Sequence, residues 1–381
     1  MLYIEHAAAY PEEQNKYVTL SKLPYLDIVL IRPESWKDGS RTENFKMHAR
    51  ASSFKSVLAN SAFKGFRHRS FFTNNVGKAF RNFQPDIIHL FEEANTFFSL
   101  QALILKLMYC RSAKLIFDNF QNIITDHVDY RFYPLYESIE KLVFKHAICA
   151  TARYEGSKQF LEHKNFKKRI YELPWGTDVS RFRPTDGSHI RQRYKLDGFT
   201  IGYIGRIENE KGIFLLLDAI ANIKQDITLL VAGTGSAKQK MLEMAEKYRL
   251  GKKFRYVGYI SHSELPAFYS ALDCIVVPTI TMNRCKEQFG RVLVEAMACK
   301  TPVIGSTSGA IPSVVGNAGL VFRENDVDDL VQKIVLLANN VELRQRYSQA
   351  GKQRVHQCFS LQKFSERCLE IYHEVLATSA D

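Results

Sequence analysis

At 381 residues, with 46% hydrophobic and 24% charged residues, the chain has an ordinary globular composition and is long enough for two domains. It has no run of the roughly 18 apolar residues that a membrane span needs, and its N-terminus lacks the pattern of a secretion signal. The seven cysteines are scattered without a Cys-x-x-Cys pair, which disfavours a disulfide framework or a zinc site. We therefore expect a soluble cytoplasmic protein.

The formal net charge of +12 is unevenly spread, because residues 44–85 contain no acidic residue. This basic window holds Lys46, Arg50, Lys55, Lys64, Arg67, Arg69, Lys78 and Arg81, interleaved with Phe54, Phe63, Phe66, Phe71 and Phe72. Such a mixture suits an anionic membrane surface. A solvated basic face with core phenylalanines explains it equally well. No recognised nucleic-acid-binding module lies nearby, so we expect no nucleic-acid partner.

Strand-like and helix-like segments alternate along most of the first half, a pattern typical of a parallel sheet flanked by helices. Strands are predicted at 2–5, 27–31, 86–90, 114–117, 147–151 and 169–173. Helices are predicted near 15–23, 96–109 and 136–146. The turn-forming residues of 174–184 then interrupt the alternation and mark a domain boundary.

A second alternating series begins at Phe199. Its strands are predicted at 200–204, 228–232, 254–257, 274–277, 302–305 and 319–322. Its helices are predicted at 213–223, 237–248, 289–299, 327–339 and 361–376. The domains would then be 1–184, 185–358 and a C-terminal helical segment, 359–381. Two doubly wound halves would place ligand sites at the carboxyl ends of their strands, facing a shared cleft.

The most informative segment is the predicted helix at 289–299, which is apolar nearly all round and therefore buried. Glu295 lies inside it, where a carboxylate is costly unless it is paired or hydrogen-bonded. The adjacent hydroxyls of a ribose could satisfy it, and so could a neighbouring arginine. Glu287 lies just ahead of the helix, about 12 Å away at helical rise. Unpaired N–H groups near Phe289 and Gly290 suit a diphosphate, so one element could hold a ribose, a diphosphate and a sugar.

Two loops that follow predicted strands are further candidates. In the first, Arg206 and Lys211 could hold a diphosphate and stabilise its charge as it departs. Lys211 could equally be an exposed charge in the first turn of a helix. In the second, Gly233 and Gly235 lack the third glycine of a dinucleotide fingerprint. They permit either close approach of the backbone to a ligand or only a tight turn.

The acidic run at Asp326, Asp328 and Asp329 is similar to an Asp-x-Asp metal clamp. It precedes a predicted helix, where acids cap free N–H groups and stabilise the helix dipole. We therefore predict a helix cap there, and we expect neither a catalytic metal nor a cofactor.

Taken together, these segments resemble the retaining GT-B glycosyltransferases of family 4, the glycosyl transferases group 1. The match runs from about 202 to 322, with its motifs in the family's order. They are a Gly-Arg-x5-Lys-Gly-like stretch at 205–212, Ala-Gly-x-Gly at 232–235, Val-Gly-Tyr at 257–259, the Glu287 and Glu295 pair, Pro-Val-Ile at 302–304 and Gly-Ala-Ile-Pro at 309–312. The stretch 175–184 looks like the family's interdomain linker. The resemblance implies an α/β GT-B fold of two facing Rossmann-like domains, with a C-terminal helix crossing back to the N-terminal domain.

The resemblance also implies a role for each matching residue. Glu295 would hold the nucleotide ribose, and Glu287 would contact the hydroxyls of the transferred sugar. Arg206 and Lys211 would neutralise the leaving diphosphate. The other implied donor-binding positions are Gly205, Gly233, Gly235, Tyr259, Gln288, Phe289, Gly290, Arg291 and Val292. The implied reaction retains the anomeric configuration without a metal.

Several positions depart from the family pattern. Lys300 stands where the family has glycine, at a cost of about 1 kcal/mol if its backbone is left-handed. Ser313 replaces the usual glutamate, and the first loop at 7–10 lacks the usual paired glycines.

The first half carries candidate residues of its own. Where many relatives carry a histidine, this chain has Asp118, which could orient or deprotonate an acceptor hydroxyl. It could also be a helix cap or a turn former. Glu92 and Glu93, after the strand at 86–90, are further candidates of the same kind.

We therefore predict transfer of a sugar from a UDP- or GDP-sugar to a hydroxyl of a glycan or lipid-diphosphate-linked acceptor, in the synthesis of a cell-surface polysaccharide. Domain 185–358 would bind the donor and domain 1–184 the acceptor, with a peripheral contact to the inner face of the cell membrane through 44–85. The alternatives are a non-catalytic nucleotide-sugar scaffold or sensor, and a transferase with a soluble small acceptor.

Overall fold

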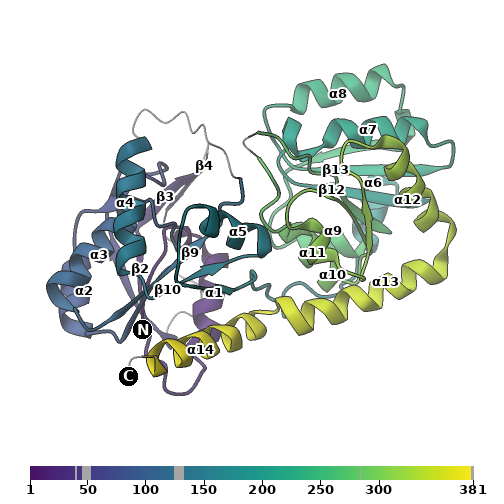
Figure 1. Cartoon of the computed structure of the whole chain (residues 1–381). Helices are drawn as coiled ribbons and strands as arrows, with labels where there is room; N and C mark the ends of the chain where they lie inside the picture. Colours follow the sequence, from purple (N-terminus) through teal and green to yellow (C-terminus); the bar gives the residue numbers. More distant parts are fainter. Residues whose placement is uncertain (39–40, 45–52, 124–132, 284, 379–381) are drawn as a thin grey trace. The chain divides into compact units, whose positions relative to one another are not determined.

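The computed structural model describes residues 1–38, 41–44, 53–123, 133–283 and 285–378. The chain divides into two compact units. The first unit combines Met1–Pro174 with the C-terminal segment Leu361–Asp381, and the second unit is Trp175–Ser360. Each unit contains a parallel sheet flanked by helices (Figure 1). None of the described helices is long and apolar enough to cross a membrane.

The first unit is built on a seven-stranded parallel sheet with the order β11-β10-β9-β8-β1-β2-β5. Its strands are β1 (Leu2–Ile4), β2 (Val29–Pro33), β5 (Lys55–Ala59), β8 (Ile87–Leu90), β9 (Lys114–Asn119), β10 (Cys149–Ala152) and β11 (Arg169–Glu172). All six strands predicted for this half are present. The sequence does not predict β5, because this edge strand lies in the basic window and only its last residue is buried.

Two small antiparallel pairs lie outside this sheet and are also missed by the sequence. One joins β3 (Ser35–Asp38) to β4 (Arg41–Asn44), and the other joins β6 (Ser61–Ala62) to β7 (Phe71–Phe72). Strands of two to four residues are too short for an alternation of apolar and polar residues to show.

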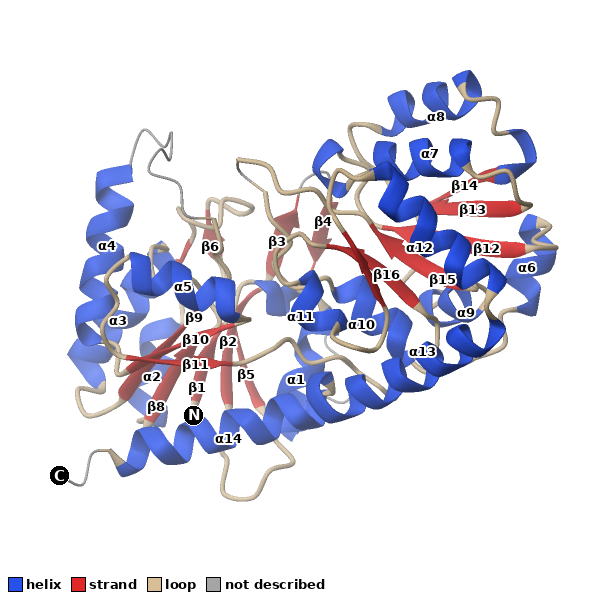
Figure 2. Cartoon of the chain, turned by 45° about the vertical axis from the view of Figure 1, so that its right-hand side comes forward, coloured by secondary structure: helices blue, strands red, loops and turns tan. Residues whose placement is uncertain are grey.

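Helices cover both faces of the seven-stranded sheet (Figure 2). On one face, Leu2 and Ile4 pack with α2 (Val76–Phe83), α3 (Phe97–Tyr109), α4 (Tyr133–His146) and α5 (Glu155–His163). On the other face, Met1 and Tyr3 pack with α1 (Pro11–Leu20) and α14 (Leu361–Ala377). Because side chains alternate along a strand, the single strand β1 contributes to both cores.

The C-terminal helix α14 is tied to the sheet by a buried polar cluster around Tyr372. The Tyr372 hydroxyl accepts a hydrogen bond from the Tyr3 hydroxyl at 3.1 Å and lies 2.8 Å from Nδ1 of His89. Burial, together with the charges of Arg153 and Lys16, lowers the pKa of His89 to about 3, which keeps the ring neutral. The predicted return of the last helix to the N-terminal domain is therefore confirmed.

Replacing Tyr372 with phenylalanine should weaken the attachment of α14. Tyr372→Phe leaves the apolar contacts in place but deprives Tyr3 and His89 of a buried partner, at about 1–3 kcal/mol. Urea unfolding of the full chain would measure the loss. His373→Ala, on the exposed side of the same helix, is the matched control and should change stability little. Equal stabilities for Tyr372→Phe and the unmodified chain would contradict this account of α14.

The second unit is built on a six-stranded parallel sheet with the order β14-β13-β12-β15-β16-β17. Its strands are β12 (Phe199–Ile204), β13 (Ile227–Ala232), β14 (Phe254–Gly258), β15 (Cys274–Val277), β16 (Val303–Ser306) and β17 (Leu320–Phe322). All six were predictable, because each is a short apolar run bounded by turn residues or a helix.

The helices of the second unit include several that the sequence does not predict. They are α6 (Ser188–Tyr194), α7 (Ile213–Asn222), α8 (Lys238–Lys247), α9 (Leu265–Ser270), α10 (Arg291–Ala298), α11 (Ile311–Val315), α12 (Val327–Asn339) and α13 (Val341–Arg354). The missed ones, α6, α9, α11 and α13, are short or mostly polar. Helix α13, for example, buries Tyr347 and Gly351 alone, so it carries no apolar stripe.

Two local predictions are confirmed. The Asp326 side chain accepts a hydrogen bond from the Asp329 N–H at 2.9 Å and caps α12. Lys300 has φ +65°, so a lysine does occupy the left-handed position after α10, where glycine carries no steric cost.

Candidate functional site

The loops that follow β12 and β13 pack against each other backbone to backbone. A Cβ on Gly233 would overlap the carbonyl oxygen of Gly205, and one on Gly235 would overlap that of Ile207. The Ile207 N–H donates to the Thr234 carbonyl at 2.9 Å, which joins the two loops directly. These glycines are therefore required for close approach between two parts of the chain itself.

The turn after Gly235 already holds an anion of the protein. The Glu208 carboxylate accepts hydrogen bonds from the N–H of Ser236 at 2.9 Å and from its hydroxyl at 2.5 Å. Because these donors lie just before α8, the carboxylate takes the place that a phosphate would take at a helix N-terminus. The turn after Gly235 is thus tied to the loop of Glu208.

Two more glycines draw the neighbouring loops together around Glu287. A Cβ on Gly212 would overlap the carbonyl oxygen of Pro278, which follows β15. A Cβ on Gly309, which follows β16, would overlap the carbonyl oxygen of Glu287. Both glycines have positive φ, +70° and +57°, so a side chain would be strained there in any surroundings.

The Glu287 carboxylate forms the centre of this cluster. Its Oε2 lies 2.8 Å from Nζ of Lys211 and accepts a hydrogen bond from the Thr279 hydroxyl at 2.9 Å. Burial would raise its pKa, but the charge of Lys211 and the hydrogen bonds from Lys211, Thr279 and the Phe289 N–H lower it below the ordinary value. The site therefore contains an ionised, oriented carboxylate paired with a partly exposed ammonium.

The start of α10 differs from the prediction. The helix begins at Arg291 after Gly290, whose φ of +82° makes it a left-handed N-cap. The Phe289 N–H is not an unpaired helix donor, because it donates to the Glu287 carboxylate. Phe289 itself is buried against Phe359, with ring centroids 5.6 Å apart. The prediction of a free N–H at Phe289 was therefore wrong, since the carboxylate just before the helix takes it.

Glu295 is buried inside α10, as its sequence context predicts, and is 6% exposed. The hydroxyl of Tyr269, on α9, donates to its Oε2 at 2.7 Å. Burial and then the negative charge of Glu295 raise the pKa of Tyr269 well above its ordinary value, so the hydroxyl remains a donor. The sequence does not reveal this partner, because Tyr269 lies 26 residues away on a short helix.

The side chains at the remaining predicted donor-binding positions are exposed or partly buried. Arg206 follows β12, and its side chain is 65% exposed and 3.4 Å from Glu210. Tyr259 follows β14 and is 54% exposed. Gln288 and Arg291 are exposed and Val292 is partly buried. The carboxyl ends of β12, β13 and β14 and the start of α10 thus carry most of the residues that the sequence singled out.

The comparisons with known proteins point to the same part of the chain. The sequence pattern of glycosyl transferases group 1 matches residues 188–354, within the second unit. The Staphylococcus aureus capsular polysaccharide biosynthesis glycosyltransferase CapM is 30% identical over 265 residues, which cover 66% of this chain and 67% of CapM. The chain belongs to the glycosyl transferases group 1 family.

Other matches are less identical to this chain, and some cover less of it. A glycogen synthase of Mycobacterium tuberculosis is 29% identical over 175 residues, 45% of this chain but only 41% of that protein. A structure of Anabaena HepE in complex with UDP has a TM-score of 0.73 at 16% identity and covers 98% of this chain and 99% of that one. At that identity the likeness shows the GT-B fold alone.

Asp118 of the first unit is fully buried and is bound by other side chains. Its Oδ1 accepts a hydrogen bond from the Thr151 hydroxyl at 2.6 Å, and its Oδ2 is paired with Arg153. Burial raises the pKa of Asp118, while Arg153 and Thr151 oppose that shift. Both carboxylate oxygens are thus engaged inside the protein.

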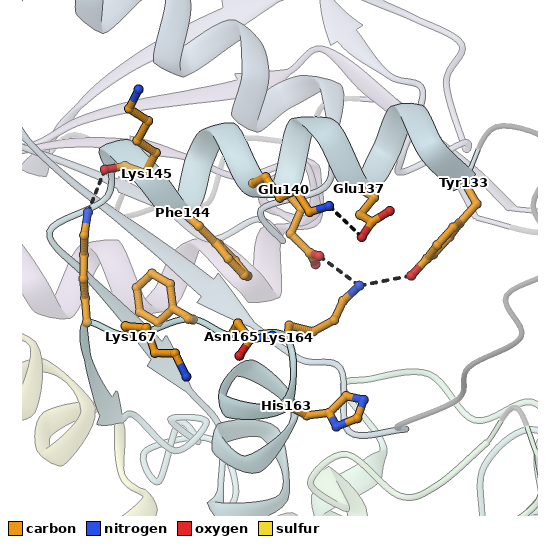
Figure 3. A pocket seen from close by; sticks show the side chains of 12 residues that line it. Tyr133, Glu137, Glu140, Phe144, Lys145, His163, Lys164, Asn165 and Lys167 are labelled. Carbon is orange, nitrogen blue, oxygen red and sulfur yellow. Dashed lines mark hydrogen bonds and ion pairs between the residues drawn. The ribbon is translucent and has the colours of Figure 1, made fainter.

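A separate groove of about 600 Å³ lies in the first unit between α4 and the segment after α5 (Figure 3). Nζ of Lys164 is 3.0 Å from Glu140 and 3.2 Å from the Tyr133 hydroxyl, and Lys141 is 3.0 Å from Glu137. None of the predicted donor or acceptor residues lines this groove. The groove runs along α4 from Tyr133 to Lys145 and along residues 163–168.

Backbone packing predicts a sharp contrast between two glycines of the second unit. Gly233→Ala would force a Cβ into the Gly205 carbonyl at φ +138°, so we expect a large loss of stability and of soluble protein. Gly251→Ala also has positive φ, +51°, but its Cβ meets nothing within 4 Å, so it should cost only about 1 kcal/mol. Thermal unfolding of both variants measures the difference. Equal melting temperatures would show that the loops do not require this contact.

Proposed function

We propose that the protein binds a nucleoside diphosphate sugar through its second unit and transfers the sugar with retention of anomeric configuration. The observation that carries this proposal is the Glu287–Lys211 pair. It presents an ionised carboxylate and a cation side by side at the carboxyl edge of a Rossmann-like sheet. A carboxylate accepts hydrogen bonds from sugar hydroxyls, and an ammonium offsets the charge of a diphosphate.

Each residue has a role in this proposal. Lys211 and Arg206 stabilise the charge that develops on the diphosphate as its bond to the sugar breaks. Glu287 holds the hydroxyls of the transferred sugar. Glu295 accepts hydrogen bonds from the ribose diol, with the Tyr269 hydroxyl fixing one of its oxygens. The bond between the sugar and the diphosphate breaks, and its electron pair leaves with the diphosphate. The acceptor hydroxyl forms the new bond to the sugar and passes its proton to the departing diphosphate.

The nucleotide of the donor is UDP or GDP in this proposal. UDP is supported by a neighbour of the same fold, Anabaena HepE, which was solved in complex with UDP. Residues 185–358 would form the donor-binding domain, and residues 1–184 with the segment 359–381 the acceptor-binding part. A non-catalytic nucleotide-sugar sensor is the second candidate. It would bind a donor but neither transfer nor hydrolyse it.

Thermal shift with UDP and GDP tests the donor site. A nucleotide that binds only the folded chain stabilises it by about 2.7 kcal/mol at a hundred times its Kd. We expect one of the two to raise the melting temperature, and Glu295→Gln to lose that shift while keeping the bond to Tyr269. Glu342→Gln, on the exposed side of α13, is the matched control and should keep it. No shift in the unmodified chain at millimolar nucleotide would contradict the donor site.

We also propose that the acceptor is lipid-linked and that the protein meets it at an anionic membrane. Phe63 and Phe66 are 61% and 62% exposed and alternate with exposed Lys64, Arg67 and Arg69, so residues 63–69 form a basic aromatic tip. The capsular polysaccharide role of CapM supports a cell-surface glycan as the product.

Only part of the basic window supports this membrane contact. Phe54 and Phe72 are buried, so the alternative of core phenylalanines holds for these two. Lys46 and Arg50 lie outside the described residues.

Vesicle sedimentation tests the membrane contact. We expect the protein to bind vesicles rich in phosphatidylglycerol at physiological salt and the double variant Phe63→Ser, Phe66→Ser to bind at least tenfold more weakly, because two exposed rings are lost. Tyr25→Ser is the matched control, since Tyr25 is the most exposed aromatic side chain of the same unit. If the unmodified protein stays in the supernatant, the acceptor is soluble and this part of the proposal is wrong.

A further inference from the structure

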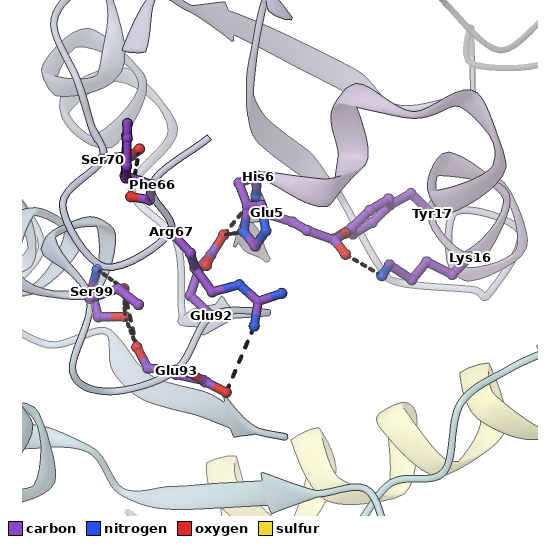
Figure 4. A network of polar contacts seen from close by, with 11 residues as sticks. Glu5, His6, Lys16, Tyr17, Phe66, Arg67, Ser70, Glu92, Glu93 and Ser99 are labelled. Atoms are coloured by element: carbon purple, nitrogen blue, oxygen red, sulfur yellow. Dashed lines mark hydrogen bonds and ion pairs between the residues drawn. The ribbon is translucent and has the colours of Figure 1, made fainter. Parts of the chain in front are cut away.

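The carboxyl edge of the seven-stranded sheet gathers buried charged and polar side chains that the donor site does not use. Glu5 and His6 follow β1, and Glu92 and Glu93 follow the adjacent strand β8. Figure 4 shows His6 against Glu92, with Glu5 turned towards Lys16 and Tyr17 and Glu93 towards Arg67. This edge is where α/β sheets bind their ligands.

Two carboxylates of this edge are satisfied within the protein. Glu5 lies 2.6 Å from Nζ of Lys16 and accepts a hydrogen bond from the Tyr17 hydroxyl at 2.5 Å. Asp118 is paired with Arg153. The ammonium of Lys16 and the guanidinium of Arg153 are donors only, so neither can accept a hydrogen bond from a ligand.

Glu92 has a different partner, the imidazole of His6. The Glu92 Oε1 lies 2.6 Å from both the backbone N–H and Nδ1 of His6, and the carboxylate is fully buried. Two donors on one oxygen fix the ring and favour the tautomer with the proton on Nδ1. The other carboxylate oxygen, Oε2, is enclosed and has no hydrogen-bond partner in the described chain.

The second ring nitrogen of His6 is left to accept a hydrogen bond. Nε2 bonds to no described residue, and the side chain keeps 7% of its surface exposed. Trp36 and Phe98 lie against the ring, with centroids 4.7 Å and 6.2 Å away. The two neighbouring rings therefore hold the imidazole in place, and the lone pair of Nε2 has a fixed position.

We propose that His6 binds a hydroxyl of the sugar or polyol acceptor through Nε2, and that Glu92 is the positioning residue that fixes its tautomer. This inference rests on the proposed function, because it names a contact of the acceptor in the same reaction. The hydroxyl donates its hydrogen bond to Nε2.

Sequence reasoning reached Glu92 but not His6. The available signal was a histidine placed directly after the first predicted strand, at a carboxyl strand end. Its partner lies 86 residues away, and only the order of the strands brings the two together.

Substitutions of His6 separate this contact from donor binding. His6→Asn retains a donor at the place of Nδ1 but removes Nε2, whereas His6→Gln can carry an acceptor to the place of Nε2. With octyl glycosides of glucose, galactose, mannose and N-acetylglucosamine as acceptor probes, we expect kcat/KM for the acceptor to fall about 10- to 100-fold in His6→Asn. We expect His6→Gln to recover part of it. His373→Asn, exposed on α14, is the matched control.

Hydrolysis of the donor by water and the nucleotide thermal shift should be unchanged in His6→Asn. If the unmodified chain shows neither, the proposed function is wrong. If it shows both and His6→Asn transfers sugar as well as the unmodified chain, the role of His6 is wrong.

Chemical modification tests the role of His6 even if no glycoside serves as acceptor. Diethyl pyrocarbonate acylates an unprotonated, accessible imidazole nitrogen, so mass spectrometry should find His6 modified. At least one glycoside should slow that modification several-fold, and Glu92→Gln should alter its rate. A His6 that stays unmodified while His373 reacts, or that no glycoside protects, would overturn the proposal.

Discussion

The second unit depends on how closely its backbone segments approach one another at the carboxyl edge of its sheet. Gly233 and Gly235 admit the loop after β12 to within contact of the loop after β13. Gly212 does the same for the loops after β12 and β15, and Gly309 for the loops after β15 and β16. No other residue fits these four places without moving a main-chain carbonyl. The loops that carry the charged residues of this edge are therefore held together mainly by contacts between backbone atoms.

That backbone framework fixes the positions of charged groups. Glu287 is held through its carbonyl beside Gly309 and through its carboxylate by Lys211 and Thr279. Glu295 is held by Tyr269 from a different helix. Both carboxylates are thus oriented before any ligand arrives, which reduces the reorganisation that binding or reaction would require. The first unit shows the same principle at the His6–Glu92 pair.

The sequence predicted the sheets of both units well, because most of their strands are short apolar runs. It missed β5, an edge strand in which only the last residue is buried, so no pattern of apolar residues marks it. The sequence also singled out Glu295, because a carboxylate stands out in apolar surroundings, and Glu287, because it lies just ahead of the same helix. It could not give their partners: Tyr269 and the start of α10 at Arg291 depend on tertiary contacts. The sequence indicated that the motif glycines have a special role. Only the packing of the loops shows that other parts of the chain fill the space beside them.

Hydrogen–deuterium exchange of the full chain with and without a saturating nucleoside diphosphate tests the central claim most directly, namely that the donor binds where these loops meet. The account predicts slower exchange in peptides that cover 205–212 and 287–295, where ligand would bind the polar groups and damp the opening of the loops. Peptides covering 133–168, around the groove of the first unit, should exchange as before. Protection confined to other segments, with 205–212 and 287–295 unchanged, would contradict the account.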